Sequence, residues 1–102
     1  MDRPIVRYRF DATVPVQELE GTLLLAVLAA ESLHGEATVA LDARFAIDPE
    51  RCTLVIDAGT DAGRTIARVF GGYVRHEFGA GSYTVERLSD REVVGPAAAP
   101  AA

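Results

Sequence analysis

The sequence predicts an α+β fold in which four antiparallel strands form one sheet and two helices cover one of its faces. Two observations carry this prediction: alternating apolar and polar residues mark four strands, and apolar residues at helical spacing mark two longer segments. Along residues 4–88 they follow one another as strand, helix, strand, strand, helix and strand, joined by short loops. That order is the split βαβ pattern of a ferredoxin-like sandwich, which hosts many unrelated functions and so implies no activity.

The first strand and the first helix have clear local signals. In IVRYRFDATV, apolar side chains alternate with charged ones, which predicts a half-buried strand with Tyr8 and Phe10 toward the core. Pro15 ends this strand. From residue 16 to residue 33 the apolar residues recur at helical spacing, until the pair HG at 34–35 supplies a glycine stop.

A hairpin is expected next. EATVALDARFAI, residues 36–47, alternates again and predicts a strand whose core side carries Ala37, Val39, Leu41, Ala43, Phe45 and Ile47. DPER at 48–51 places Asp and Pro at the first two positions of a type I turn. CTLVIDAG at 52–59 is then the returning strand.

The second helix and the last strand complete the pattern. Residues 61–78 are helical in period, GAGS ends the helix, and YTVERL at 83–88 is a short strand. The core side of this helix is expected to carry Ile66, Val69, Phe70, Tyr73 and Val74. Residues 1–90 thus form one domain, and the Ala- and Pro-rich residues 91–102 are expected to be a flexible tail.

Right-handed crossovers would make the first and third strands central and leave the sheet face opposite the helices open. Alternation predicts that this open face carries charged and mixed side chains, namely Arg7, Arg9, Asp42, Arg44, Thr53, Val55 and Asp57. An RNA-binding sheet would instead show aromatic side chains on this face. Because Tyr8 and Phe10 turn toward the core, RNA binding is not favoured.

Composition excludes several further classes. The net charge is −5, with ten basic residues that are all arginine, so duplex nucleic acid is an unfavoured partner. A single cysteine, Cys52, suits a reducing cytoplasm, and the N-terminus lacks the pattern of a signal peptide. The apolar block at 23–30 is far shorter than the roughly 20 residues of a membrane span. The absence of lysine and the abundance of alanine suggest a GC-rich, bacterial genome. We expect a cytoplasmic protein.

The stretch VIDAGT, residues 55–60, resembles the first phosphate loop of actin-like and hexokinase-like ATPases. In that family a strand follows the loop, whereas here a helical pattern follows. A helix N-terminus favours negative charge, which makes a candidate site for an anion or nucleotide from Asp57, Gly59, Thr60, Asp61, Gly63 and Arg64. The alternative needs no ligand: Gly59 lets the chain turn, and Thr60 or Asp61 caps the helix by accepting a hydrogen bond from an amide.

The first helix carries a second apolar face. Its core stripe leaves other apolar residues on the sides where a surface helix should be polar, and these are Leu24, Leu25, Leu28 and Ala29. Loops or the tail could cover them within one chain. Otherwise this face is an interface, and we expect a homo-oligomer that contains it.

A basic ridge is expected on the second helix. Arg64, Arg68, Gly71 and Arg75 recur at spacings of 4, 3 and 4, which aligns them on one line opposite the apolar side. A solvated outer face explains such a ridge. The alternative is the docking of another protein with an acidic surface, for which arginine is well suited.

No catalytic arrangement is predicted. His34, His76 and Cys52 lack a partner at the spacing that catalysis or metal binding requires, so neither cofactor nor metal is expected. The sequence favours a non-enzymatic protein-interaction module that self-associates or serves as an accessory subunit of a larger bacterial assembly. The alternative is a small regulatory domain that binds an anion or nucleotide at the start of the second helix.

Overall fold

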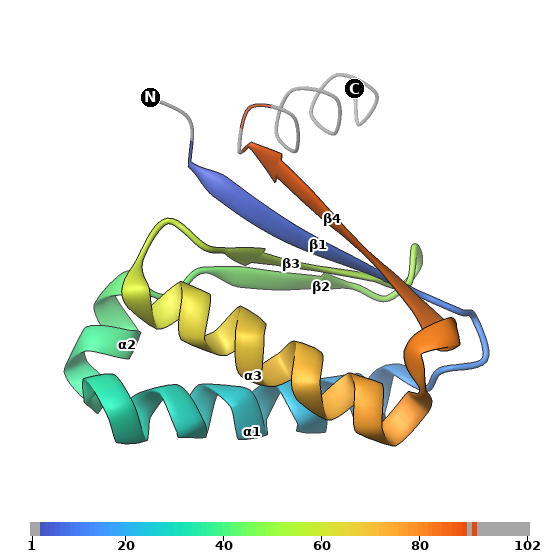
Figure 1. Ribbon diagram of the computed structural model, residues 1–102, viewed down its shortest axis with the longest axis horizontal. Coiled ribbons are helices and arrows are strands. Elements are labelled where there is room, and N and C mark those ends of the chain that lie inside the picture. The colour runs from blue at the N-terminus through green and yellow to red at the C-terminus, as the bar shows by residue number, and fades with distance from the viewer. Residues whose placement is uncertain (1–2, 90, 92–102) are drawn as a thin grey trace.

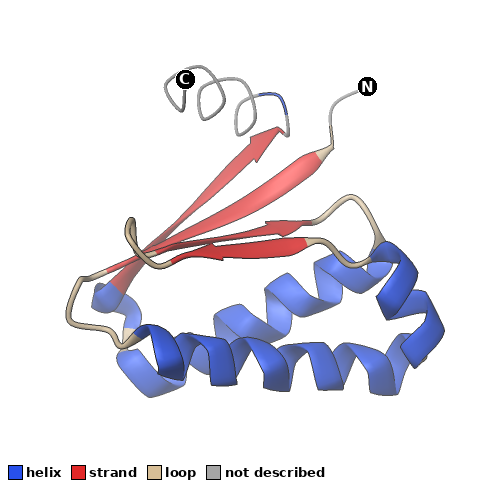
Figure 2. Cartoon of the chain, turned by 180° about the vertical axis from the view of Figure 1, so that it is seen from behind, coloured by secondary structure: helices blue, strands red, loops and turns tan. Residues whose placement is uncertain are grey.

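The computed structural model describes residues 3–89 and 91, and in this part the protein has two layers (Figure 1). One layer is a four-stranded sheet, and the long helices α1 and α3 lie together on one of its faces, as the view from behind also shows (Figure 2). The elements are β1 (Pro4–Phe10), α1 (Val16–His34), α2 (Glu36–Asp42), β2 (Phe45–Asp48), β3 (Thr53–Asp57), α3 (Asp61–Phe78), a 3-10 turn (Ala80–Ser82) and β4 (Tyr83–Ser89). The α+β class is confirmed.

The strand order in the sheet is β2-β3-β1-β4, and every neighbouring pair is antiparallel. The first and third strands are therefore central, as predicted. Tyr8 of β1 lies opposite Leu54 of β3 on one side and Val85 of β4 on the other. Because side chains directly opposite one another share a face of the sheet, these three point toward the helix layer.

Helix α1 confirms the predicted helix and ends at Gly35. Gly35 has a φ of 90°, which glycine adopts without steric penalty, and its N–H donates to the Glu31 carbonyl. The side of α1 that faces the rest of the molecule buries Leu19, Thr22, Leu23, Ala26 and Ala30. Helical spacing predicts a core stripe of Val16, Leu19, Leu23, Val27 and Ala30, of which Leu19, Leu23 and Ala30 are buried and Val16 and Val27 are half-buried.

The predicted strand over residues 36–47 is wrong in its first half. Residues 36–42 form α2, bent by 119° from α1, and only 45–48 enter the sheet as β2. The described part of the chain thus has three α-helices where two were predicted. Glu, Ala and Leu are strong helix formers, and one helical turn suffices to bring Val39 into the core. As a result Leu41 is 72% exposed, and Asp42 leaves the sheet face on which it was expected.

The hairpin turn and the second predicted helix are as expected. Asp48 Oδ1 accepts hydrogen bonds from the N–H groups of Glu50 and Arg51, at 3.2 and 3.3 Å. Cys52, expected to open the strand, lies in the turn before β3 with a φ of 53° and is half-buried. Helix α3 has the predicted bounds and ends at Gly79, whose φ is 83°.

The core lies between the sheet and the helix layer. Its largest fully buried side chains are Phe70, Leu54, Ile56, Ile66 and Val74. The Phe70 ring meets Tyr8 edge to face, with ring centroids 5.0 Å apart. Tyr73, expected beside Phe70 on the core side of α3, is instead mostly outside the core and 38% exposed.

The open face of the sheet carries an arginine pair on one carboxylate. Arg7 Nε and Arg9 Nε each donate to Glu86 Oε1 at 3.0 Å, and these hydrogen bonds lower the pKa of Glu86. Asp57, expected to be exposed here, is buried and accepts from Arg3 Nε at 2.7 Å. The predicted tail, residues 91–102, lies outside the described residues except for Arg91.

Candidate functional site

The outer side of α1 exposes three large apolar side chains. Leu24, Leu25 and Leu28 are 58%, 51% and 49% exposed. At about 100° of rotation per residue they lie within an arc of roughly 100°, turned away from the buried stripe. We call these three residues the leucine face. Ala29, predicted to belong to it, is half-buried beside it.

Small and acidic residues surround the leucine face. Gly21 and Ser32 lie on the same side of α1, one turn before and one turn after the leucines. The helix contains Glu18, Glu20 and Glu31 but no lysine or arginine. The outer side of α1 is therefore apolar in its middle and negative along its border.

At the predicted anion site at the start of α3, several polar groups bond to one another within the chain. Thr60 Oγ1 accepts from the Gly63 N–H at 3.0 Å, which is the predicted helix cap. Asp57 Oδ1 accepts from the Gly59 N–H at 2.8 Å. The Gly59 and Gly63 N–H groups, which could otherwise donate to an anion, thus already donate to side chains of the same loop. Anion binding at these residues stays a prediction.

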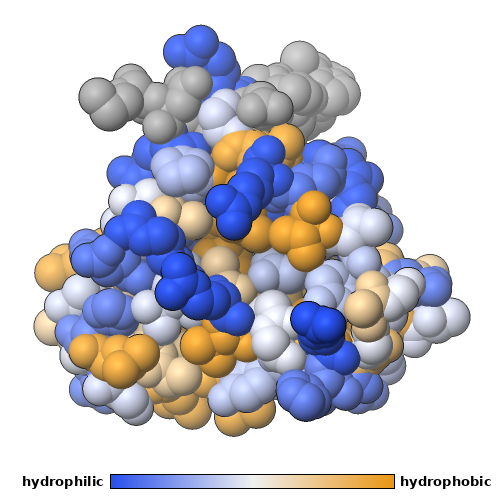
Figure 3. All heavy atoms as spheres, in the orientation of Figure 1, coloured by the Kyte–Doolittle hydropathy of each residue, from blue (hydrophilic) through white to orange (hydrophobic). Residues whose placement is uncertain are grey.

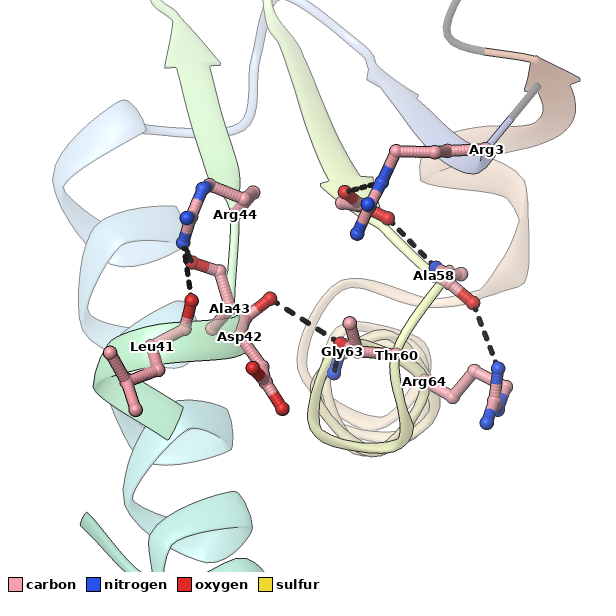
Figure 4. A network of polar contacts seen from close by, with 11 residues as sticks. Arg3, Leu41, Asp42, Ala43, Arg44, Ala58, Thr60, Gly63 and Arg64 are labelled. Atoms are coloured by element: carbon pink, nitrogen blue, oxygen red, sulfur yellow. Dashed lines mark hydrogen bonds and ion pairs between the residues drawn. The ribbon is translucent and has the colours of Figure 1, made fainter. Parts of the chain in front are cut away.

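Figure 4 shows how this loop is tied to its neighbours. The Thr60 hydroxyl donates to the Asp42 carbonyl at 3.4 Å, which connects the loop to the end of α2. Arg64 Nη1 donates to the Ala58 carbonyl at 3.2 Å, and the same guanidinium forms an ion pair with Asp61. Arg44, predicted on the open sheet face, instead donates to backbone carbonyls at the end of α2.

A groove separates α3 from β4 and the first half of β1. It has a volume of about 400 Å³ and is lined by Pro4, Ile5, Val6, Tyr8, Ala58, Arg64, Ala67, Arg68, Val85 and Arg87. We call it the α3–β4 groove. On the front face of the molecule, apolar surface between β4 and α3 lies among hydrophilic side chains (Figure 3). The groove exists because β4 extends beyond the part of the sheet that α3 covers (Figure 1).

Arginine is the charged residue of this groove. Arg64 and Arg68 line it from α3 and Arg87 from β4, and no acidic residue is among its lining residues. Within the described part of the chain, Arg68 and Arg87 form neither an ion pair nor a side-chain hydrogen bond. The structure therefore splits the predicted basic ridge: Arg64 and Arg68 line the groove, whereas Arg75 is exposed outside it.

Gly71 does not belong to the outer ridge where its spacing placed it. A Cβ atom at this position would lie 2.8 Å from the Tyr8 hydroxyl, so Gly71 faces the sheet. The Tyr8 hydroxyl donates to the Ala67 carbonyl, one helical turn before Gly71, at 2.8 Å. The absence of a side chain at Gly71 thus lets the Tyr8 ring reach α3.

The ionisation of Tyr8 should make stability fall at high pH. Burial, with a smaller contribution from Tyr83, raises the pKa of Tyr8 from 10.0 to about 12. The unfolded chain ionises first, so the stabilisation is complete below pH 10 and is lost as pH rises through about 12. Urea unfolding across this pH range should show a steeper decline for the wild type than for Tyr8→Phe. Parallel declines would contradict this assignment.

The two histidines differ in their contacts. His34 Nε2 and the Thr65 hydroxyl share a hydrogen bond of 2.7 Å, which connects the end of α1 to α3. His76 is exposed. No group of three His, Cys, Asp or Glu side chains within residues 3–89 and 91 is arranged to hold a metal ion.

Comparison with known proteins assigns no family: the chain matches no family model and no curated protein. In the described residues, no single helix is long and apolar enough to cross a membrane, and α1 with α2 reaches that length only across their bend of 119°. The leucine face and the α3–β4 groove are the two surfaces of the molecule from which a function can be inferred.

Proposed function

We propose that the protein is a non-enzymatic interaction module that self-associates through the leucine face of α1. The observation that carries this proposal is the exposure of Leu24, Leu25 and Leu28, each about half, on adjacent turns of one helix. Contiguous apolar surface of this kind on a small domain is typical of an interface. A domain of 102 residues also gains much from association, because its own core is small.

The size of the leucine face suits a reversible dimer. Full burial of one leucine is worth about 1.5–3 kcal/mol. Six half-exposed leucines from two copies would thus contribute roughly 4–9 kcal/mol, against about 4–15 kcal/mol of freedom lost on association. The free energy gained by burying the leucines is therefore comparable to the free energy lost on association. We therefore expect a dimer that forms at high protein concentration and dissociates on dilution.

An antiparallel pair of α1 helices fits this surface. A two-fold axis between residues 26 and 27 sets Leu25 of one copy opposite Leu28 of the other. The same axis sets Gly21 opposite Ser32, and these small residues allow the helices to approach closely. Glu20 and Glu31 would border the interface on one side, where like charges repel.

The mass in solution tests the proposal. Across a concentration series, sedimentation equilibrium should show the wild type passing from monomer to dimer, while Leu25→Glu stays a monomer because it buries a charge in the interface. Leu33→Glu is the matched control: Leu33 is 72% exposed but lies about 140° around α1 from Leu28, so this variant should dimerise as the wild type does.

The dependence of self-association on salt concentration provides a second, independent test. Each copy carries a net charge of −5, and the border of the interface is acidic, so added salt should strengthen the association by screening this repulsion. A wild type that stays monomeric at high concentration and high salt would refute self-association. A Leu25→Glu variant that still dimerises would place the interface elsewhere.

We also infer that the chain is a variant of the ferredoxin-like sandwich in which α2 replaces the first half of the second predicted strand. The order β2-β3-β1-β4 and the positions of α1 and α3 between strands support this. The added helix α2 is the departure from that layout.

A further inference from the structure

We propose that the α3–β4 groove binds a small organic anion, with an apolar body of one or two rings and a phosphate group. This site goes beyond the proposed self-association and uses other elements, because the leucine face lies on α1. A volume of about 400 Å³ is in the usual range of small-molecule sites, which combine an apolar lining with a few polar groups. The groove has this composition.

The apolar half of the site is the floor of the groove. Val6, Tyr8 and Val85 provide it from the sheet, and Ala67 provides it from α3. Val85 points toward the helix layer yet remains 50% exposed, so its contact surface is available to a ligand. Tyr8 and Ala67 are only 4% and 8% exposed, so they form the base of the groove, and Val6 and Val85 provide most of the apolar surface that a ligand can contact. A flat apolar body can therefore lie on this floor.

The charged half comes from two opposite walls. Arg68 reaches the groove from α3 and Arg87 from β4, and neither has a carboxylate or carbonyl partner within the described residues. Arg64 adds a third positive charge, although Asp61 partly neutralises it. A phosphate with several oxygens can accept from arginines on both walls, and arginine binds phosphate through paired N–H groups. Two such contacts favour phosphate over a group with a single oxygen.

A depression on the open face of the sheet makes the contrast clear. It is also lined by arginines, namely Arg7, Arg9 and Arg51. There, however, Glu86 binds both Arg7 and Arg9, and Asp48 lies 3.8 Å from Arg51. Each arginine of that depression is therefore paired with a carboxylate of the chain. In the α3–β4 groove, Arg68 and Arg87 are not.

Charge also argues against a second copy of the chain in this groove. A symmetric pair of copies that joined their two grooves would bring arginines together, with no acidic residue among the lining residues of either groove. The protein as a whole is acidic, with a net charge of −5, so a groove lined by arginine is a local exception that attracts small anions. The occupant that these charges favour is an anion.

The test uses 1-naphthyl phosphate as the probe, measured by isothermal titration calorimetry. 1-Naphthol supplies the apolar body alone, and inorganic phosphate supplies the anion alone; each should bind at least about tenfold more weakly, because it loses one half of the site. Added salt should weaken the binding of the probe, which is the opposite of its expected effect on self-association.

Variants locate the binding. Arg68→Ala combined with Arg87→Ala should lower the affinity for the probe at least about tenfold, since charged hydrogen bonds to phosphate are lost. Arg75→Ala is the matched control: Arg75 is also an exposed arginine of α3 but does not line the groove, so its loss should change the affinity less than about twofold. Leu25→Glu should bind the probe as the wild type does, so failure of the dimer and failure of this site can be told apart.

Several results would overturn the proposal. They are no binding of the probe to the wild type, equal binding of inorganic phosphate, and equal losses in the Arg75 and the double variant. Because all three arginines are exposed, the variants should fold, and circular dichroism verifies this. In Val85→Asp a carboxylate enters the floor, and a variant that folds yet binds the probe as well as the wild type would also overturn it.

Discussion

Replacing Phe70 by alanine should lower the free energy of unfolding by about 3–5 kcal/mol, because the cavity left by a buried aromatic ring is only partly refilled. Phe70 is 0% exposed and its ring contacts those of Tyr8 and Phe10, with centroids 5.0 and 6.1 Å away. Since small domains are stabilised by only about 5–15 kcal/mol, this change removes a large share of the total. Urea unfolding followed by circular dichroism measures it.

Tyr73→Ala is the control for this prediction. Tyr73 is an aromatic residue of the same helix but is 38% exposed, so its truncation should cost clearly less than that of Phe70. Equal losses from the two substitutions would show that the packing of Phe70 from α3 against β1 does not dominate the core.

Replacing Gly63 by alanine should cost about 3 kcal/mol or more, at the upper end of what overpacking produces. A Cβ atom at this position would lie 1.9 Å from the backbone oxygen of Asp57 and 3.1 Å from its carbonyl carbon. Both are backbone atoms of β3, so the first turn of α3 would have to move away from the sheet. That movement would also disturb the hydrogen bond from the Gly63 N–H to Thr60.

Gly72 on the same helix should respond in the opposite direction. A Cβ atom at Gly72 meets nothing within 4 Å, so Gly72→Ala should stabilise the protein by about 1 kcal/mol through helix propensity alone. Chemical unfolding of both variants makes the comparison. A Gly63→Ala variant as stable as the wild type would mean that the contact between α3 and β3 is looser than the structure has it.

The elements that could be predicted from the sequence are those with local signals at their ends. Thr60 caps α3, Gly79 ends it and Gly35 ends α1, and each of these acts on backbone groups within four residues. The turn at Asp48 is local in the same sense. Residues 36–42 lack such a signal, because alternation of alanine with valine and leucine fits a short helix as well as a strand.

The two candidate surfaces also differ in whether the sequence alone could predict them. The exposure of Leu25 and Leu28 follows from the rotation of a single helix, so the sequence predicted the leucine face. The groove could not be predicted, because Arg68 and Arg87 line it only after β1 has paired with β4 and α3 has packed beneath β1. The alternation in YTVERL placed Val85 and Arg87 on one side of a strand, which was the available signal.

By itself, the sequence determined the helices α1 and α3, the hairpin turn, the central place of β1 and β3 and the second apolar face of α1. Only the tertiary structure decided that residues 36–42 are helical, that Gly71 faces Tyr8, that Asp57 is buried against Arg3 and that three arginines line one groove. The reason is physical. Caps, turns and helical periodicity act over a few residues, whereas burial and the meeting of charges depend on which segments, far apart in the chain, pack against one another.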